Sequence, residues 1–227
     1  MKGVFVTGTD TDCGKTEIGL ALMAALRDRG LEVLGMKPVA SGCERTAEGL
    51  RNEDARRLRA QGSREMPYVQ INPYAFEPPI APHIAAGRAG VDIELDVVRE
   101  SVQQLSTKSD FLLVEGVGGW RVPLGPSLSV SDLPLALDLP VILVCGIKLG
   151  CINHGLLTAE CIRSSGARLA GWVANQIDPD MLARDENLAT LAALLGAPCL
   201  GVVPWMASPD PRSIATHLDV TPLIETA

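Results

Sequence analysis

The 227 residues are 47% hydrophobic and 21% charged, and 20 Lys and Arg against 27 Asp and Glu give a formal net charge of -7. This length and apolar content suit one globular domain with a large core and exclude fibrous, disordered and small disulfide-stabilised proteins. The acidic balance argues against nucleic acid or an anionic membrane as a partner, so an anionic ligand needs a local site. We therefore expect a single domain over residues 1–227.

Several features of the chain indicate a cytoplasmic protein. No two of the six cysteines form a C-x-x-C pair, and a chain of this size does not need disulfides, so we expect reduced thiols. The N-terminus lacks the apolar core of a signal peptide. The longest apolar stretch, residues 133–147, contains Asp138 and two prolines and is shorter than the ~20 residues of a spanning helix. We interpret it as a buried strand with its approach and expect no membrane partner.

Short apolar runs alternate with longer helical stretches along the chain. The strands are expected at residues 3–7, 32–36, 111–114, 141–145, 168–174 and 199–203. The helices are expected at residues 15–29, 52–59, 95–105, 154–165 and 181–195. Most of the strands are continuously apolar, as strands buried on both faces are, and the alternation favours right-handed crossovers. The fold class is therefore α/β, a doubly wound, mostly parallel sheet, with the Pro-rich residues 72–83 as an ordered loop on the substrate side.

A phosphate-binding loop, the P-loop (residues 8–16), lies between the first strand and the first helix. The loop and the helix N-terminus present backbone N–H groups to phosphate, Lys15 supplies a charge to the β- and γ-phosphates, and Thr16 offers its hydroxyl to Mg²⁺. Five residues separate Gly8 from Gly14, one more than is usual. The alternative is a chance glycine turn before a helix, which the strand–loop–helix order disfavours. We expect a P-loop NTPase-like sheet.

A carboxylate follows the third expected strand. Glu115 comes directly after residues 111–114 and precedes Gly116-Val117-Gly118-Gly119. Carboxylate oxygens suit Mg²⁺, and the glycines allow the backbone to approach a phosphate or a substrate. The pattern is similar to the second motif of nucleotide-binding proteins, with Glu in place of Asp. The alternative is a strand-ending acid before an ordinary glycine turn.

Lys37 and Asp54 are candidates for the same site. Pro38 biases Lys37 toward an extended backbone, so its ammonium can project beyond the second strand toward the P-loop and stabilise charge on a phosphoryl group. Lys37 taken alone is more often a solvated surface lysine. Asp54 can equally be a first-turn acid that complements a helix dipole, and spacing alone does not choose it over Glu53.

One edge of the predicted sheet gathers all of these groups, because the carboxyl ends of parallel strands share an edge and ligands of open α/β sheets bind there. The groups that come within a few residues of the end of a predicted strand, or just beyond the loop after it, are Lys15, Lys37, Glu115, the 148–153 loop, Asn175 and Trp205.

The order of the motifs resembles the dethiobiotin synthase family over about residues 3–206. The matching runs are GTDTDCGKT, KPVASG, GLRNEDA, INPYAF, VEGVGGW, LPVILV, KLGCINH, GWVAN and a late PW. The resemblance implies an ATP- and Mg²⁺-dependent enzyme of biotin biosynthesis. In this family CO₂ (or bicarbonate) carboxylates 7,8-diaminopelargonate to a carbamate, which attacks the γ-phosphate; the second amine then closes a cyclic urea, and the products are dethiobiotin, ADP and phosphate.

The resemblance also implies roles for single residues. Lys37 is the family's catalytic lysine, assisted by Lys15, and Thr11 and Ser41 contact the substrate. Thr16, Asp54 and Glu115 surround Mg²⁺. The chain departs from the family at Gln176, where Asp is expected. The remaining nucleotide-binding positions are Asp12, Cys13, Gly14, Gly116, Val117, Gly118, Asn175, Gln176, Pro204, Trp205 and Met206.

A homodimer is implied as well, with the substrate site at the subunit interface. The loop 148–153 is expected to open a helix at His154, and a helix N-terminus suits a carboxylate. In the family this loop comes from the second subunit and holds the carboxylate end of the substrate. Cys151 is then a small neighbour and not a nucleophile, because His154 is expected to pack at the start of the helix and not to act as a catalyst. The residues concerned are Gly150, Cys151, Ile152 and Asn153.

Three alternative functions are compatible with parts of the sequence pattern. A GTPase switch is suggested by Asn175-Gln176-Ile177-Asp178, which is similar to the guanine-reading N-K-x-D pattern with Gln in place of Lys. A partitioning-type ATPase would dimerise on ATP. An amide-forming relative acting on corrin acids would need a glutamine-hydrolysing domain, for which 227 residues leave no room.

Overall fold

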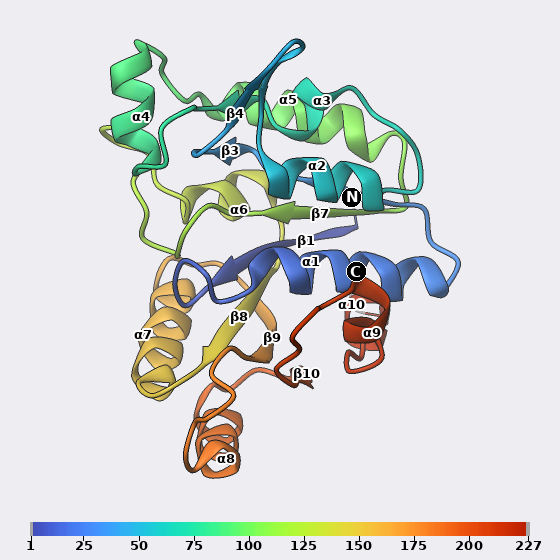
Figure 1. Cartoon of the computed structure of the whole chain (residues 1–227), viewed down its shortest axis with the longest axis vertical. Coiled ribbons are helices and arrows are strands. Elements are labelled where there is room, and N and C mark those ends of the chain that lie inside the picture. Colours follow the sequence, from blue (N-terminus) through green and yellow to red (C-terminus); the bar gives the residue numbers. More distant parts are fainter. Residues whose placement is uncertain (1, 226–227) are drawn as a thin grey trace.

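A six-stranded, wholly parallel sheet with the strand order β10-β9-β8-β1-β7-β2 forms the centre of the molecule (Figure 1). The computed structural model describes residues 2–225; the predicted domain 1–227 also includes residues 1, 226 and 227, which lie outside the described residues. The six strands are those expected from the sequence, namely β1 (Gly3–Gly8), β2 (Val33–Met36), β7 (Phe111–Glu115), β8 (Val141–Ile147), β9 (Leu169–Gln176) and β10 (Cys199–Val203).

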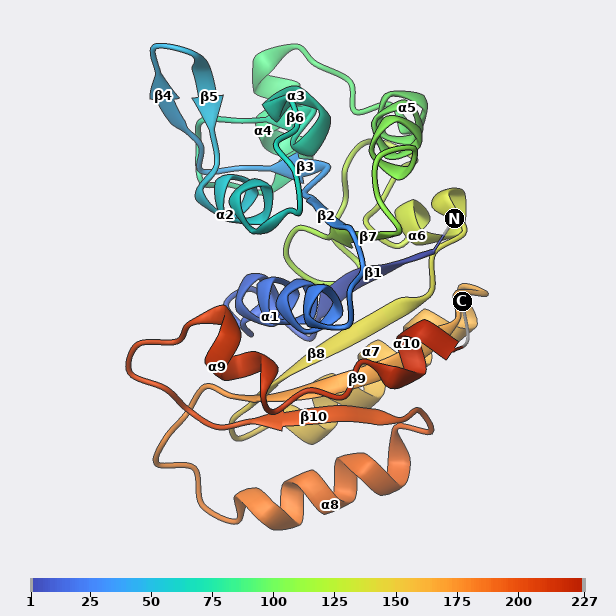
Figure 2. The same cartoon turned by 90° about the vertical axis from the view of Figure 1, so that its right-hand side faces the viewer.

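Helices cover both faces of this sheet (Figure 2). Strands β1, β7 and β8 and the edge strand β2 are buried along their whole length, which explains their continuously apolar sequences. One face packs against α1 (Lys15–Asp28), α9 (Pro211–Ala215) and α10 (Thr221–Glu225). The other face packs against α5 (Leu95–Ser106), α6 (Asp132–Leu137), α7 (Cys151–Ser164) and α8 (Arg184–Leu194). The prediction of a doubly wound α/β sheet is confirmed.

Two expected elements begin elsewhere. The helix expected from His154 begins three residues earlier, at Cys151, because Gly150 takes a left-handed φ of 93° and turns the chain out of β8. The stretch 133–147 was expected to be a strand with its approach. Its second part is the strand β8, which begins at Val141, but its first part lies in the helix α6. Pro134 is compatible with α6 because it falls in the first helical turn.

The segment between β2 and α5 contains small elements that the sequence pattern does not predict. Helix α2 (Glu53–Gln61) was expected there. The others are β3 (Val39–Ala40), β4 (Glu44–Thr46), β5 (Gly49–Arg51), α3 (Tyr68–Ile71), β6 (Tyr74–Ala75) and α4 (Pro82–Ala89). Strands β3 and β6 pair in parallel, and β4 and β5 form a hairpin. The segment 72–83 is ordered, as expected, and its position on the substrate side stays a prediction.

All six cysteines are free thiols, as expected. None of the helices in residues 2–225 combines the length and apolar character that a membrane-spanning helix requires.

Candidate functional site

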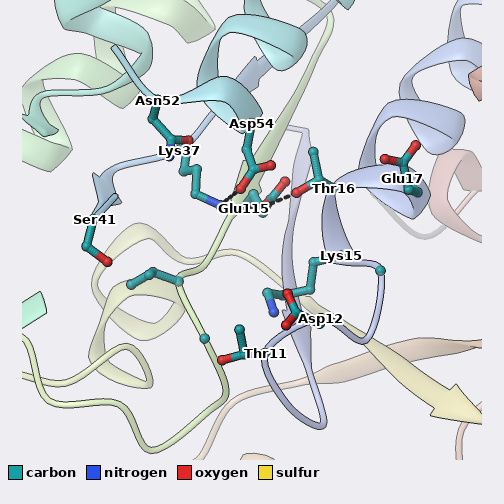
Figure 3. A pocket seen from close by; sticks show the side chains of 13 residues that line it. Thr11, Asp12, Lys15, Thr16, Glu17, Lys37, Ser41, Asn52, Asp54 and Glu115 are labelled. Carbon is teal, nitrogen blue, oxygen red and sulfur yellow. Dashed lines mark hydrogen bonds and ion pairs between the residues drawn. The ribbon is translucent and has the colours of Figure 1, made fainter. Parts of the chain in front are cut away.

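A cavity of about 390 Å³ opens at the carboxyl edge of the sheet, beside the P-loop (Figure 3). It is lined by four chain segments that are far apart in sequence. The lining residues are Thr11, Asp12, Gly14, Lys15, Thr16, Glu17, Lys37, Ser41, Asn52, Asp54, Glu115, Val117 and Gly118. Lys15, Lys37 and Glu115 therefore share one cavity, and the structure places them together, as expected for groups at the carboxyl ends of parallel strands.

The P-loop joins β1 to α1 with a backbone that only glycine tolerates at its end. Gly14 has a φ of 91°, and a Cβ there would collide with the side chain of Asn175. Gly14 caps α1 without a side-chain hydrogen bond, so the first N–H groups of the helix are available to an anion. Lys15 Nζ donates to the backbone oxygen of Asp10 at 2.9 Å. The loop thus has the arrangement of a phosphate site.

Lys37 lies directly after β2 and is 5% exposed, so it is not a solvated surface lysine. Its Nζ donates to Asp54 Oδ2 at 2.7 Å and to Glu115 Oε1 at 2.6 Å. Burial acts to lower the pKa of Lys37, but the charges of Glu115 and Asp54 outweigh burial and hold this pKa above its ordinary value. The cavity therefore contains a permanently charged ammonium.

Helix α2 selects Asp54 over Glu53. Asn52 caps the helix by accepting a hydrogen bond from the Ala55 N–H at 3.1 Å, and Asp54, in the first turn, points at Lys37. The side chain of Glu53 is 73% exposed and lies 3.9 Å from Arg56. Burial acts to raise the pKa of Asp54, but the nearby Lys37 charge lowers this pKa below its ordinary value. Asp54 is thus the carboxylate that α2 contributes to the site, beside Glu115 from the end of β7.

The oxygen atoms of this cavity suit Mg²⁺. Thr16 Oγ1 donates to Glu115 Oε1 at 2.8 Å, and Glu115 Oε2 is buried with no hydrogen-bond partner. An orphaned carboxylate oxygen inside a protein is costly, and a hard cation would satisfy it. Mg²⁺ is usually held by one or two carboxylates together with substrate phosphates and water. The pair Asp54 and Glu115 with the Thr16 hydroxyl fits that pattern.

A second cavity of about 230 Å³ adjoins the first and shares Gly14 and Glu17 with it. Two amides, Asn175 and Gln176, face an otherwise largely apolar wall. Asn175 Nδ2 donates to the backbone oxygen of Cys13 at 3.0 Å, so Asn175 also holds the P-loop in place. The flat, mostly apolar shape suits a nucleobase. The other lining residues are Ile177, Val203, Pro204, Trp205, Met206, Pro209 and Ile214.

The segment 148–153 does not line either cavity of its own chain. Leu149 is 89% exposed, and Gly150 is followed by the first turn of α7, where Ile152 is half-buried and Asn153 is exposed. Cys151 is buried and its thiol lies 3.8 Å from Asn187 Oδ1. The predicted substrate residues Gly150, Cys151, Ile152 and Asn153 therefore stand apart from the cluster around Lys37.

The sequence reasoning missed two residues of the first cavity, Glu17 and Asn52, and four of the second, Ile177, Val203, Pro209 and Ile214. Glu17 lines both cavities and is held by Arg57 through contacts of 2.5 and 2.8 Å. Asn52 lines the first cavity, and its position immediately before a helix is a capping signal that could have identified it. Glu17 carries no comparable signal, because an acidic residue in a first helical turn is common.

Comparisons with known proteins agree with one another. A family model described as an AAA domain matches residues 2–213. A protein of Pseudomonas paraeruginosa called ATP-dependent dethiobiotin synthetase BioD is 54% identical over 224 residues, which are 98% of this chain and 98% of that protein. A protein of the same name from Cellvibrio japonicus is 51% identical over 99% of this chain and 98% of its own. The MinC:MinD cell division complex of Aquifex aeolicus shares the fold, with a TM-score of 0.58, 17% identity and coverage of 91% of this chain and 83% of that chain.

Proposed function

Because the chain belongs to the family of ATP-dependent dethiobiotin synthetases, we propose that it makes dethiobiotin from 7,8-diaminopelargonate, CO₂ or bicarbonate, and ATP. The observation that carries this proposal is the Lys37 ammonium, which is buried between two carboxylates in the same cavity as the P-loop. Such an arrangement provides positive charge where a carboxylate-like nucleophile and a γ-phosphate meet.

The proposed reaction has three steps. One amine of the substrate attacks CO₂ and loses a proton, which gives a carbamate. A carbamate oxygen attacks the γ-phosphate, the bond from that phosphorus to ADP breaks, and a carbamic–phosphoric anhydride forms. The second amine attacks the carbonyl carbon, phosphate leaves, and a second proton is released as the cyclic urea closes.

The residues of the cavity contribute mainly charge and position. Lys37 and Lys15 stabilise negative charge on the carbamate and on the phosphoryl group during transfer. Thr11 and Ser41, on two edges of the cavity, orient the diamine. The N–H groups at the start of α1 bind the phosphates of ATP, together with Asp12, Cys13 and Gly14. The glycine turn Gly116-Val117-Gly118 lets the backbone approach the transferred group.

We assign the metal-binding role to Thr16, Asp54 and Glu115. Mg²⁺ bound there would neutralise charge on the β- and γ-phosphates of ATP. In the structure Lys37 supplies the positive charge between the two carboxylates. Lys37 would therefore be free to turn toward the reacting oxygens when the carboxylates have another cation.

The second cavity is proposed to hold the adenine base. Asn175 and Gln176 offer amide groups at one side, and Trp205 provides a flat apolar surface. Gln176 is itself held, since its Oε1 accepts a hydrogen bond from Arg184 at 3.3 Å. Pro204 and Met206 complete the wall on either side of Trp205.

We further propose that residues 1–227 act as one domain in a cytoplasmic homodimer. The start of α7 supports this, because Gly150, Cys151, Ile152 and Asn153 line neither cavity of their own chain, and Gly150 and Asn153 are exposed. They would hold the carboxylate end of the diamine in the cavity of the second subunit, where the N–H groups of a helix N-terminus suit an anion. Six free thiols fit a reducing compartment.

The proposal is tested by measuring phosphate release with ATP and Mg²⁺ while the diamine or bicarbonate is left out. We expect phosphate release to need both, because the γ-phosphate has no acceptor until the carbamate forms. Dethiobiotin formed should equal phosphate released. Turnover of GTP or ATP without the diamine would instead support a switch or partitioning NTPase and would contradict the proposal.

The shared site predicts complementation between two defective subunits. Asn153→Ala alone should chiefly raise the KM for the diamine, and Lys37→Ala should chiefly lower kcat. A hybrid dimer of the two variants, purified through two different tags, contains one site with both residues intact, so its turnover should return to about half that of the wild type. Gln103→Ala, an exposed amide on α5, is the matched control for Asn153. A hybrid without recovered turnover would show that each subunit builds its own complete site.

A further inference from the structure

Tyr68, the first residue of α3, connects the chain segments that carry Lys37 and Asp54. Its phenolic oxygen accepts a hydrogen bond from the backbone N–H of Asn52 at 2.7 Å and donates one to Asn72 Oδ1 at 3.0 Å. The tyrosine does not line the catalytic cavity itself. Any effect of Tyr68 on the cavity must therefore pass through Asn52 and Asn72.

The Asn72 branch holds the backbone of Lys37. Asn72 is 3% exposed, and its Nδ2 donates to the backbone oxygen of Lys37 at 2.8 Å and to that of Tyr74 at 3.1 Å. The Lys37 N–H donates to the backbone oxygen of Ile71 at 2.8 Å. Both backbone polar groups of Lys37 are thus bound by the end of α3, namely by Ile71, its last residue, and by Asn72, which follows it.

The Asn52 branch holds the helix that carries Asp54. Asn52 Oδ1 accepts the Ala55 N–H at 3.1 Å, and Asn52 O accepts the Arg56 N–H at 3.0 Å. The Tyr68 hydroxyl binds the remaining backbone group of Asn52, its N–H. The Tyr68 hydroxyl therefore joins the N-terminus of α2, which carries Asp54, to Asn72, which anchors Lys37. The side chains of Lys37 and Asp54 meet at 2.7 Å.

The ring of Tyr68 is held independently of its hydroxyl. The guanidinium of Arg51 lies over the ring, 4.3 Å from its centroid. Burial raises the pKa of Tyr68, so the group stays neutral at ordinary pH and can accept one hydrogen bond while it donates another. Phenylalanine would keep the ring and its contact with Arg51 and would remove only the bridge.

We propose that the Tyr68 hydroxyl is a positioning group that sets Lys37 against Asp54 by bridging Asn52 to Asn72. Its expected effect on turnover rests on the proposed function. A displacement of a reacting group by about 1 Å can lower a rate by as much as ~10²-fold. Loss of a bridge that constrains two segments should therefore lower kcat rather than the affinity for ATP, whose phosphates bind to the P-loop.

Tyr74 provides a matched control, since it is the only other tyrosine of the chain. Its hydroxyl accepts the backbone N–H of Glu94 at 2.9 Å, at the start of α5 and away from Lys37. Tyr74→Phe also removes a phenolic hydroxyl that accepts a hydrogen bond from a backbone N–H. It leaves in place the backbone oxygen of Tyr74, to which Asn72 donates. Tyr74 is 9% exposed, whereas Tyr68 is only half-buried, so a larger effect of Tyr68→Phe could not come from deeper burial of Tyr68.

The experiment compares Tyr68→Phe with Tyr74→Phe. We expect kcat for dethiobiotin formation to fall about tenfold in Tyr68→Phe with the KM for ATP within about twofold of the wild type, and both constants to stay within about twofold in Tyr74→Phe. A kcat within twofold of the wild type in Tyr68→Phe, or an equal loss in both variants, would overturn the proposal.

A second measurement does not depend on turnover. In protein labelled with ¹⁵N-lysine, a buried, ion-paired ammonium gives a slowly exchanging signal, which Lys37→Ala assigns. We expect the proton exchange of this signal to accelerate in Tyr68→Phe and not in Tyr74→Phe. A wild type that made no dethiobiotin would refute the proposed function, and the exchange measurement would still test the bridge. An unchanged exchange rate of the Lys37 signal in Tyr68→Phe would refute the bridge and leave the proposed function untouched.

Discussion

Replacing Lys37 with Ala is expected to lower kcat by on the order of 10²–10³ and to leave the affinity for ATP nearly unchanged. This is the loss usual for removing one preorganised group that stabilises charge in a transition state. ATP affinity should survive because Lys15 and the N–H groups of α1 bind the phosphates independently of Lys37. Steady-state kinetics together with ATP titration measure the two effects separately.

Two further variants sharpen this test. Lys37→Arg should not restore turnover, because a planar guanidinium cannot replace a compact ammonium between two carboxylates that lie 2.6 and 2.7 Å from its nitrogen. Lys108→Ala, which removes an exposed lysine in the turn after α5, should keep full activity. Normal turnover in Lys37→Ala would reject its catalytic role.

Removal of the Lys37 ammonium should also change how strongly Mg²⁺ stabilises the folded protein. Without Lys37, Asp54 and Glu115 face each other with no cation between them in the absence of Mg²⁺. The melting temperature of Lys37→Ala should therefore rise more on addition of Mg²⁺ than that of the wild type, because ligand binding to the folded state stabilises it by mass action. Equal shifts in the two proteins would mean that Lys37 and Mg²⁺ do not compete for these carboxylates.

The P-loop was predictable because its conformation is encoded locally. Gly14 provides the left-handed turn, an apolar strand precedes the loop, and Lys15 begins a helix. The common edge of Lys15, Lys37 and Glu115 was predictable for a different reason: right-handed crossovers place the carboxyl ends of parallel strands together. Neither inference needed any knowledge of side-chain contacts.

The choice between Asp54 and Glu53 was not predictable. Neighbouring residues of a helix point about 100° apart, so the rotation of α2 about its axis decides which acid meets Lys37. That rotation is set by the burial of Ala55 and Leu58 against the core, which is tertiary information. The burial of Lys37 is hidden in the sequence for the same reason.

The short elements between β2 and α5 were missed because two- or three-residue strands carry too little periodicity to detect. The early start of α7 was missed because Gly is only a modest helix-capping residue, so Gly150 alone does not mark the beginning of a helix. Tertiary packing of Cys151, which is 1% exposed, fixes the true start. The bridge made by Tyr68 belongs to this unpredicted region.

Glu115→Gln is expected to lower kcat on the order of 10³-fold and to weaken Mg²⁺ binding, although the change adds no volume. Glutamine can still accept the hydrogen bonds from Lys37 and Thr16 through its single oxygen. It cannot supply the negative charge, and its NH₂ group takes the position of the orphaned Oε2 oxygen. Titration with Mg²⁺ in the presence of ATP should show the loss.

The same variant is expected to destabilise the metal-free protein by about 3 kcal/mol, as removal of one partner from a buried ion pair does. Glu115 is fully buried and the side chain of Lys37 is 6% exposed, so water cannot replace the lost charge. Urea unfolding measures this difference. Glu100→Gln, an exposed position on α5, should change neither stability nor turnover.

A double variant separates the two roles of Glu115. If Glu115 stabilises the metal-free protein only as a counter-ion of Lys37, its loss should cost much less stability in a Lys37→Met background, because the buried charge is then already gone. Mg²⁺ binding, in contrast, should be weakened by Glu115→Gln in both backgrounds. A Glu115→Gln protein that is destabilised but binds Mg²⁺ with unchanged affinity would make Glu115 a partner of the lysine and leave the metal to Asp54 and Thr16.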